Sequence, residues 1–249
     1  MDNVFSVREK AILIGLYLSK FDTLGLHELG FDSAIQAFNV FGYSIGVKPA
    51  SIKNYRDEFD PYFPNQRKGW HKRELRDYCS EIMLRFESLN FNDFTRLIKN
   101  LTINNYEIEK FVKQFSTENK TEESVAKRLL TGKAAEEYFK KNYLSVPEFI
   151  GHGLFDATNL ACGFDFKTMW DNEFYCVEVK GLNLSYGNIM MTEKEFVIAR
   201  ELKWKYCLFV VANFAETPYH KLYFNPVDGR LDFQRVERKV IQTSYVTSI

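Results

Sequence analysis

Two acidic residues and a lysine stand out for the chemistry that their types and spacing allow. Asp165 follows an apolar stretch, and Glu178 and Lys180 lie in the run Phe174-Tyr-Cys-Val-Glu-Val-Lys-Gly181. Carboxylate oxygens bind hard divalent cations, and such a cation polarises a phosphate and lowers the pKa of a bound water. A neighbouring lysine positions that water or stabilises the developing negative charge. These residues therefore indicate metal-assisted hydrolysis of a phosphodiester.

The elements that must position these side chains are two strands joined by a turn. Alternate residues of a strand share a face, so Glu178 and Lys180 lie together, and the valines on either side of Glu178 face the core. A turn at 169–172 is predicted to fold the strand 161–168 back beside the strand that carries Glu178. This pairing is expected to bring Asp165 next to Glu178.

The elements downstream are predicted to complete the sheet. The stretch 191–200 should be a helix that begins with a capping box, in which Thr192 accepts from the amide of Glu195 and the glutamate reaches back. This use makes Glu195 a helix cap in the prediction and not a metal ligand. The apolar run 206–212 is expected to be a buried strand, and residues 219–241 a terminal hairpin with a long polar turn.

The spacing of acid, any residue and lysine is not specific by itself. It recurs four more times in the chain, and a solvated strand edge with an ion pair has the same pattern. Asp156 is a second candidate for the metal-binding acid. Asp165 is preferred because it abuts a predicted strand, whereas Asp156 lies in a predicted loop, 149–158. The same loop holds His152, which suits a base or a phosphate donor as well as a structural role.

Several segments resemble the PD-(D/E)xK nuclease superfamily. Within it, their order is similar to the nuclease-like domain found at the C-terminus of the plant NO VEIN protein and in many bacterial restriction-associated proteins. The resemblance covers about residues 125 to 225. The segments are Gly132-Lys-Ala-Ala-Glu-Glu137, Gly163-Phe-Asp165, Val177-Glu-Val-Lys-Gly181, Thr192-Glu-Lys-Glu195 and Leu208-Phe-Val-Val-Ala-Asn213.

The resemblance implies roles for individual residues. The metal-binding acids of the superfamily fall on Asp165 and Glu178, and its catalytic lysine falls on Lys180. The acid of its upstream helix falls on Glu136. Phe164 is a departure, because it stands where the superfamily usually has a proline. The cofactor implied is Mg²⁺, with Mn²⁺ as a substitute.

The first hundred residues are predicted to be helical. A helix is expected over 8–19, a second over 33–45 with Asp32 as its cap, and a third over 50–59 after Pro49. More helix is expected from 75 to 100. The second and third predicted helices are joined by a turn that begins with glycine, which is the arrangement of a helix-turn-helix DNA-binding motif.

The outward face of the third predicted helix and the residues after it are suited to DNA. Asparagine can recognise adenine, lysine and arginine can recognise guanine, and all three can bind phosphates. Between Lys48 and Arg76 there are eight basic and four acidic residues, a net +4, in a chain with 33 of each. A generic helical bundle with a solvated basic face has the same composition. The predicted DNA-binding residues are Lys48, Ser51, Lys53, Asn54, Arg56, Arg67, Lys68, Lys72 and Arg73. The segment 6–80 is also similar to the N-terminal part of bacterial restriction-type proteins.

Composition places the chain among globular proteins. Its 249 residues, 45% of them hydrophobic, suffice for one large or two small cores. No apolar run reaches the roughly 20 residues that cross a bilayer, and the N-terminus lacks a secretion signal. The four cysteines lack zinc-binding spacing and are expected to be reduced. The prediction is a cytoplasmic protein with no membrane partner.

The stretch 116–123 is the least apolar part of a polar segment and is the predicted domain boundary. It separates a helical DNA-binding domain, residues 1–115, from an α/β nuclease domain with a mixed sheet, residues 125–249, so the chain is α+β overall. The predicted function is Mg²⁺-dependent, site-specific cleavage of double-stranded DNA by a homodimer, as in a type II restriction endonuclease. A DNA-binding regulator with an inactive nuclease-like domain remains open, as does a repair or RNA nuclease.

Overall fold

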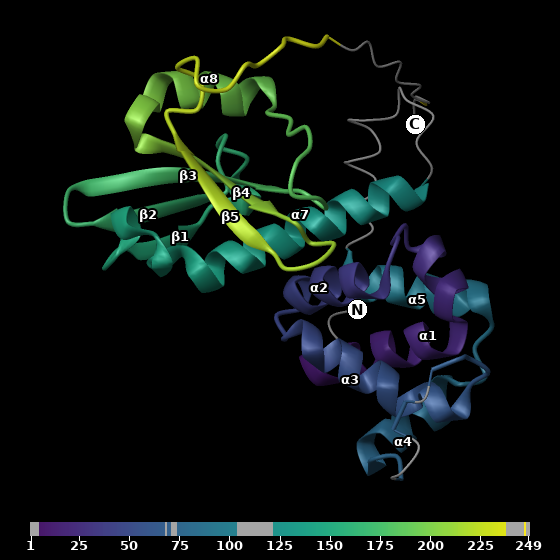
Figure 1. The fold of residues 1–249 in the computed structure, drawn as a ribbon. Coiled ribbons are helices and arrows are strands. Elements are labelled where there is room, and N and C mark those ends of the chain that lie inside the picture. Colours follow the sequence, from purple (N-terminus) through teal and green to yellow (C-terminus); the bar gives the residue numbers. More distant parts are fainter. Residues whose placement is uncertain (1–4, 68, 71–73, 104–121, 238–246, 248–249) are drawn as a thin grey trace.

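The chain folds into a helical N-terminal region followed by a five-stranded mixed sheet with helices, so it is α+β (Figure 1). The computed structural model describes residues 5–67, 69–70, 74–103, 122–237 and 247, without the side chains of 122–125. The N-terminal helices are α1 (Val7–Glu28), α2 (Ala34–Ser44), α3 (Pro49–Phe59), α4 (Asp77–Phe86) and α5 (Phe91–Thr102). The sheet region contains α7 (Glu122–Asn142), β1 (Gly153–Asp156), β2 (Phe166–Trp170), β3 (Glu173–Gly181), α8 (Glu193–Leu202), β4 (Tyr206–Ala212) and β5 (Tyr219–Phe224).

The predicted helices of the N-terminal region are present, but α1, expected over 8–19, runs to Glu28 with a non-helical residue at Asp22. The capping of α2 also differs from the prediction. The side chain of Ser33, and not that of Asp32, accepts from the amide of Gln36 and caps α2. The Asp32 carboxylate instead binds Lys127 of α7, at 2.8 Å. Pro49 is the first residue of α3, where its missing N–H costs nothing. A Cβ on Gly42 would lie 2.8 Å from the Cα of Pro49, so this glycine lets α2 and α3 meet closely.

The sheet has the strand order β1-β2-β3-β4-β5. The β3–β4 pair is parallel and its crossover contains α8, whereas the other three pairs are antiparallel. The turn between β2 and β3, expected at 169–172, is formed by Asp171 and Asn172 alone, because Met169 and Trp170 belong to β2; Asp171 has a positive φ of 50°. The predicted order of strand, turn, strand, helix and strand is therefore confirmed.

The two faces of the sheet are covered by different helices (Figure 1). On one face, Phe139 of α7 packs on the rings of Phe166 and Phe209, at centroid distances of 4.9 Å for both. On the other face, Ala199 of α8 packs against Cys176 and Tyr206. Alternation along β3 puts its buried valines on the α7 side, so its acid and lysine lie on the α8 side.

Three expectations about this region are wrong. The predicted loop 149–158 contains β1, a four-residue edge strand whose glycine and short length hide the alternation. The helix expected to start at about Thr131 begins nine residues earlier, at Glu122. The terminal hairpin does not form over 231–237, because this polar and mostly exposed segment is not a strand and β5 pairs with β4 alone. The remainder of that predicted hairpin, 238–241, lies outside the described residues.

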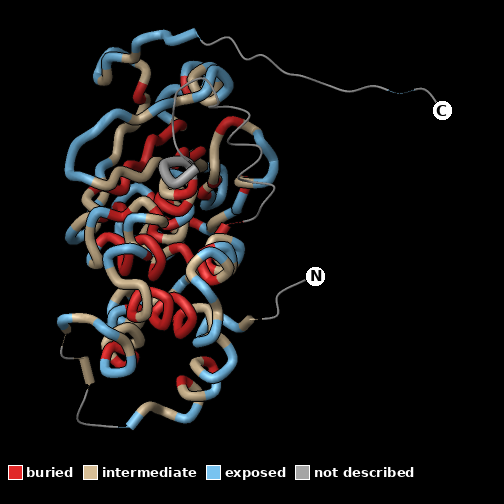
Figure 2. Tube along the Cα trace, turned by 90° about the vertical axis from the view of Figure 1, so that its right-hand side faces the viewer, coloured by how far each residue is buried: buried red, intermediate tan, exposed pale blue. Residues whose placement is uncertain are grey.

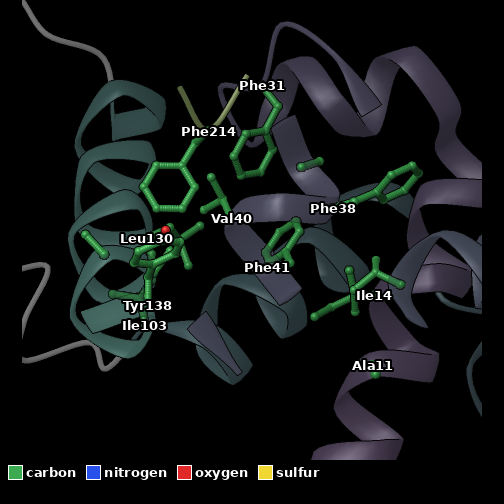
Figure 3. Packing of buried hydrophobic residues seen from close by; sticks show 14 of the residues in the cluster. Ala11, Ile14, Phe31, Phe38, Val40, Phe41, Ile103, Leu130, Tyr138 and Phe214 are labelled. Carbon is green, nitrogen blue, oxygen red and sulfur yellow. The ribbon is translucent and has the colours of Figure 1, made fainter. Parts of the chain in front are cut away.

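Among the described residues, the larger of two hydrophobic clusters connects the helical region and the sheet region, and the smaller lies under α8. Figure 3 shows Phe31 and Val40 packed near Leu130 of α7 and Phe214, which follows β4. The amide of Asn39 donates to the backbone oxygens of Phe214 and Glu216, at 2.9 and 2.7 Å. Figure 2 shows buried segments in both the helices and the sheet. Most of the predicted domain boundary, 116–121, lies outside the described residues, and 122–123 begin α7.

None of the helices in the described part of the chain has an apolar stretch long enough to cross a membrane. The four cysteines are unpaired, and Cys176 and Cys207 are buried in strands where they pack as small apolar groups.

Candidate active site

The two acids and the lysine singled out by the sequence lie together where β3 ends and β2 begins, on the face of the sheet that α8 covers. Asp165 immediately precedes β2. Because Phe166 pairs with Val177, the same register places Asp165 opposite Glu178. Its amide donates to the Val177 oxygen at 3.0 Å, and its Oδ2 accepts from the Val179 amide at 2.8 Å. These two hydrogen bonds fasten Asp165 across from Glu178.

Glu178 and Lys180 point to the same side of β3 and form an ion pair. Lys180 Nζ lies 2.5 Å from Glu178 Oε1, and the Glu178 side chain is 5% exposed while that of Lys180 is 20% exposed. The next residue, Gly181, lets α7 approach the strand, because a Cβ there would lie 2.7 Å from the Thr131 oxygen. The glycine thus fixes how closely the helix that carries Glu136 approaches the strand that carries the pair.

Burial and neighbouring charges shift the pKa values of Asp165, Glu178 and Lys180. Burial raises the pKa of Asp165 to about 6, against the hydrogen bond from Val179 and the charge of Lys180. Burial, followed by the charge of Asp165, raises the pKa of Glu178 well above its ordinary value. Burial by itself lowers the pKa of Lys180, but the charges of Glu178 and Glu195 outweigh it and the pKa is raised. The lysine therefore carries its proton at neutral pH.

Glu195 belongs to this group, which the sequence did not indicate. The predicted capping box is present, with the Glu195 amide donating to Thr192 Oγ1 and Glu195 Oε2 accepting from the Thr192 amide at 2.9 Å. The same Oε2 lies 2.9 Å from Lys180 Nζ. The capping signal explained the glutamate by itself, so nothing in the sequence pointed to a second contact 15 residues upstream.

Glu136 lies on α7 and is half-buried. The adjacent Glu137 pairs with Lys140 at 2.9 Å, and Lys140 also pairs with Asp156 at 2.9 Å. Asp156 ends β1, so it does abut a strand, contrary to the reason given for preferring Asp165. Its carboxylate is occupied by Lys140 and by the hydroxyl of Thr158, at 2.7 Å. Participation of Glu136 in the site stays a prediction.

His152 is buried against the sheet, where its ring stacks on that of Tyr175 at a centroid distance of 5.9 Å. Its Nδ1 lies 3.3 Å from Thr168 Oγ1. These contacts fit the structural role rather than that of a base.

The oxygens of Asp165 and Glu178 are a donor set suited to Mg²⁺. Magnesium is commonly held by one or two carboxylates, with waters and substrate phosphates filling its other positions. Within the described ranges, no three His, Cys, Asp or Glu side chains are grouped so as to hold a metal ion. The carboxylates of Asp165 and Glu178 therefore fit a cation whose remaining ligands are water and phosphate oxygens, and not a cation bound by protein ligands alone.

The predicted DNA-binding residues fall into three sets. Lys48 and Asn54 are exposed, Ser51 is half-exposed, and Lys53 is exposed but pairs with Asp57 at 2.6 Å. Two arginines are held by carboxylates of the same region. Arg56 binds Asp57 at 2.6 Å, and Arg67 binds Asp60 at 2.8 Å, so their charges are already compensated. The last set, Lys68, Lys72 and Arg73, lies outside the described residues.

A helical region followed by a five-stranded mixed sheet makes this an α+β protein, and two acids and a lysine lie together on the face of the sheet that α8 covers. Residues 133–224 match the family model described as Protein NO VEIN, C-terminal, a domain found in nuclease-like proteins. The match runs from within α7 to the end of β5, and covers less than half of the chain. No curated protein and no solved structure matches the chain.

Proposed function

We propose that this protein is a Mg²⁺-dependent endonuclease that cleaves double-stranded DNA at a specific sequence, as type II restriction endonucleases do. The observation that carries the proposal is the largely buried group of Asp165, Glu178 and Lys180 beneath α8, within the segment that matches the NO VEIN C-terminal family. Two carboxylates and a protonated lysine are suited to metal-assisted phosphodiester hydrolysis.

The roles of the side chains follow from their geometry. Asp165 and Glu178 would hold Mg²⁺, which when bound polarises the phosphate and acidifies a water. Asp165 is kept in place by the Val179 amide, at 2.8 Å. Lys180 stays protonated, so it donates a hydrogen bond to the attacking water or to the charge that develops on the phosphate, and does not remove a proton. Glu136 is the further acid that α7 would supply.

The helical region is proposed to bind the duplex through the exposed side of α3. This helix packs its buried residues Ile52 and Phe59 inward and leaves Asn54 exposed, and Lys48, just before its first residue, is exposed too. Asparagine suits a bidentate contact to adenine, and lysine suits a phosphate. A homodimer would present two such helices to a palindromic site.

Two other functions are distinguishable from this one. In a DNA-binding regulator the nuclease-like region would be inactive, and the chain would bind duplex without cutting it. In a repair nuclease, Asp165, Glu178 and Lys180 would cleave DNA without sequence specificity, and in an RNA nuclease they would cleave RNA. The complete set of two acids and a lysine favours an enzyme over a regulator.

The test is digestion of a long viral DNA of known sequence by the purified full chain with MgCl₂. Discrete fragments are expected, and none with Lys180→Ala, which should keep most of the duplex affinity because the lysine acts on the attacking water. A smear would indicate a nonspecific nuclease. Full cleavage by Lys180→Ala, or in excess chelator, would refute the assignment of the site. Duplex binding without any cleavage by the wild-type chain would favour the regulator.

A further inference from the structure

We propose that Glu195 is a positioning residue for Lys180, and that it holds the ammonium group in place when the Glu178 carboxylate turns to a cation. This inference rests on the proposed function. Lys180 Nζ bridges Glu178 Oε1 at 2.5 Å and Glu195 Oε2 at 2.9 Å. If Glu178 exchanges its ion pair for a metal ion, Glu195 is the remaining carboxylate at ion-pair distance from the lysine in the described part of the chain.

The position of Glu195 depends on how α8 is fastened to the site. Lys194 donates to the Ala161 oxygen at 2.5 Å. Ile198 packs closely against Gly163, because a Cβ added to this glycine would lie only 2.9 Å from Cγ1 of Ile198. Both contacts tie α8 to the segment that ends in Asp165. The first turn of α8 is therefore fixed relative to the strand that carries Lys180.

A capping box alone does not account for the second contact. The other capping box of the chain, at the start of α1, has the same geometry, with Ser6 N 2.7 Å from Glu9 Oε2. Within the described residues, every hydrogen bond of the Glu9 side chain is to Ser6. Glu195 differs because its side chain is only 15% exposed and faces a lysine that is 20% exposed. The capping hydrogen bond and the ion pair both use Oε2 of Glu195. Only the ion pair needs the negative charge, so the two can be separated by a mutation that removes the charge and keeps the oxygen.

The capping box itself provides two variants that separate the functions. Glutamine serves in place of glutamate in a capping box, so Glu195→Gln keeps the hydrogen bond to the Thr192 amide and removes only the charge. Thr192→Ala removes the threonine half of the cap and keeps the glutamate charge beside Lys180. A merely structural Glu195 predicts a larger loss for Thr192→Ala, whereas a positioning Glu195 predicts a larger loss for Glu195→Gln.

The experiment compares the two variants with the wild-type chain in three measurements. Single-turnover cleavage with MgCl₂ should slow on the order of 10²-fold in Glu195→Gln, the loss typical of a displaced catalytic group, with the dissociation constant for duplex unchanged. Thr192→Ala should lower the melting temperature and leave the cleavage rate within about 3-fold of wild type, because it does not touch the ion pair. Equal rates for Glu195→Gln and wild type, or a slower Thr192→Ala than Glu195→Gln, would overturn the proposal.

The third measurement uses no metal and no DNA, so it distinguishes a failure of this proposal from a failure of the proposed function. In the ¹⁵N-lysine NMR spectrum of the metal-free chain, the ammonium signal of Lys180 should be resolved, and its loss in Lys180→Arg assigns it. Glu178→Gln removes the first ion pair as a bound cation would, so the signal should persist in Glu178→Gln and in Glu178→Gln with Thr192→Ala, and broaden beyond detection in Glu178→Gln with Glu195→Gln. A signal that persists when both glutamates are replaced shows that the charge of Glu195 does not restrain the lysine, whether or not the chain cuts DNA.

Discussion

The carboxylate at position 165 is expected to destabilise the folded protein at neutral pH, so that Asp165→Asn should be more stable than the wild-type chain. Burial raises the pKa of Asp165 from 3.8 to about 6. An acid whose pKa is higher in the folded state contributes stability that is present below pH 4 and is lost as the pH rises through about 6. The size of this loss is about 3 kcal/mol at pH 7 and above. The amide of Asp165→Asn can still accept from Val179 and carries no charge.

The measurement is urea unfolding of both chains from pH 4 to pH 8, without divalent cations. The free energy of unfolding of Asp165→Asn should equal that of the wild type near pH 4 and exceed it by an amount that grows up to about pH 7. Asp156→Asn is the matched control, because the hydrogen bonds of Asp156 to Thr158 and Lys140 outweigh its burial and lower its pKa. Asp156→Asn should be less stable than the wild-type chain at neutral pH, because the ionised form of Asp156 is favoured in the folded state. If Asp165→Asn is the less stable chain at pH 8, or if its difference from wild type does not vary with pH, burial does not disfavour the charged form of Asp165.

Three further predictions follow from the site and the helical region. MgCl₂ should raise the melting temperature of the wild-type chain and not that of Glu178→Gln, because a ligand that binds only the folded state stabilises it; equal shifts would place the cation elsewhere. Gly181→Ala should cost about 1–3 kcal/mol in urea unfolding, because its Cβ would lie 2.7 Å from the Thr131 oxygen. The control Gly132→Ala, with nothing within 4 Å of its Cβ, should stabilise the chain instead. Asn54→Ala should cost about 1–3 kcal/mol in binding to the cognate duplex, measured with CaCl₂, and little on random DNA; an equal loss on both would exclude a base contact.

The sequence alone predicted which face of the sheet Glu178 and Lys180 occupy, because the alternation of side chains along a strand depends only on neighbouring residues. The residues 177 to 180 alternate between apolar and charged, which fixes their faces without knowledge of the rest of the chain. The turn was expected at 169–172, two residues longer than the observed turn of Asp171 and Asn172, so the sequence placed Asp165 near Glu178 without giving the register of the pair. β1 was missed because four residues with a glycine at one end carry no periodicity that exceeds that of a loop.

Long-range ion pairs were beyond the sequence for a different reason. The basic excess between Lys48 and Arg76 indicated a DNA-binding surface, yet Arg67 binds Asp60 and Asp22, and the latter lies 45 residues away. Arg76 is held in the same way by Glu58, which is buried. Net charge counts residues and cannot tell a free cation from one that already has a carboxylate. Lys48, which has no carboxylate partner in the described part of the chain, is therefore a better candidate for a phosphate contact than Arg67.

The charge balance of the site explains why a cation and DNA should depend on one another in the proposed reaction. Asp165, Glu178 and Glu195 are three carboxylates around one lysine, so the fully ionised group is negative. A phosphate brought to this group is repelled, and the repulsion acts across partly buried side chains, where water screens it poorly. The helical region can hold the duplex by its exposed residues, but it does not remove this repulsion. A divalent cation between the carboxylates and the phosphate cancels the net negative charge of the group, so metal should be required for the phosphate to enter the site as well as for hydrolysis.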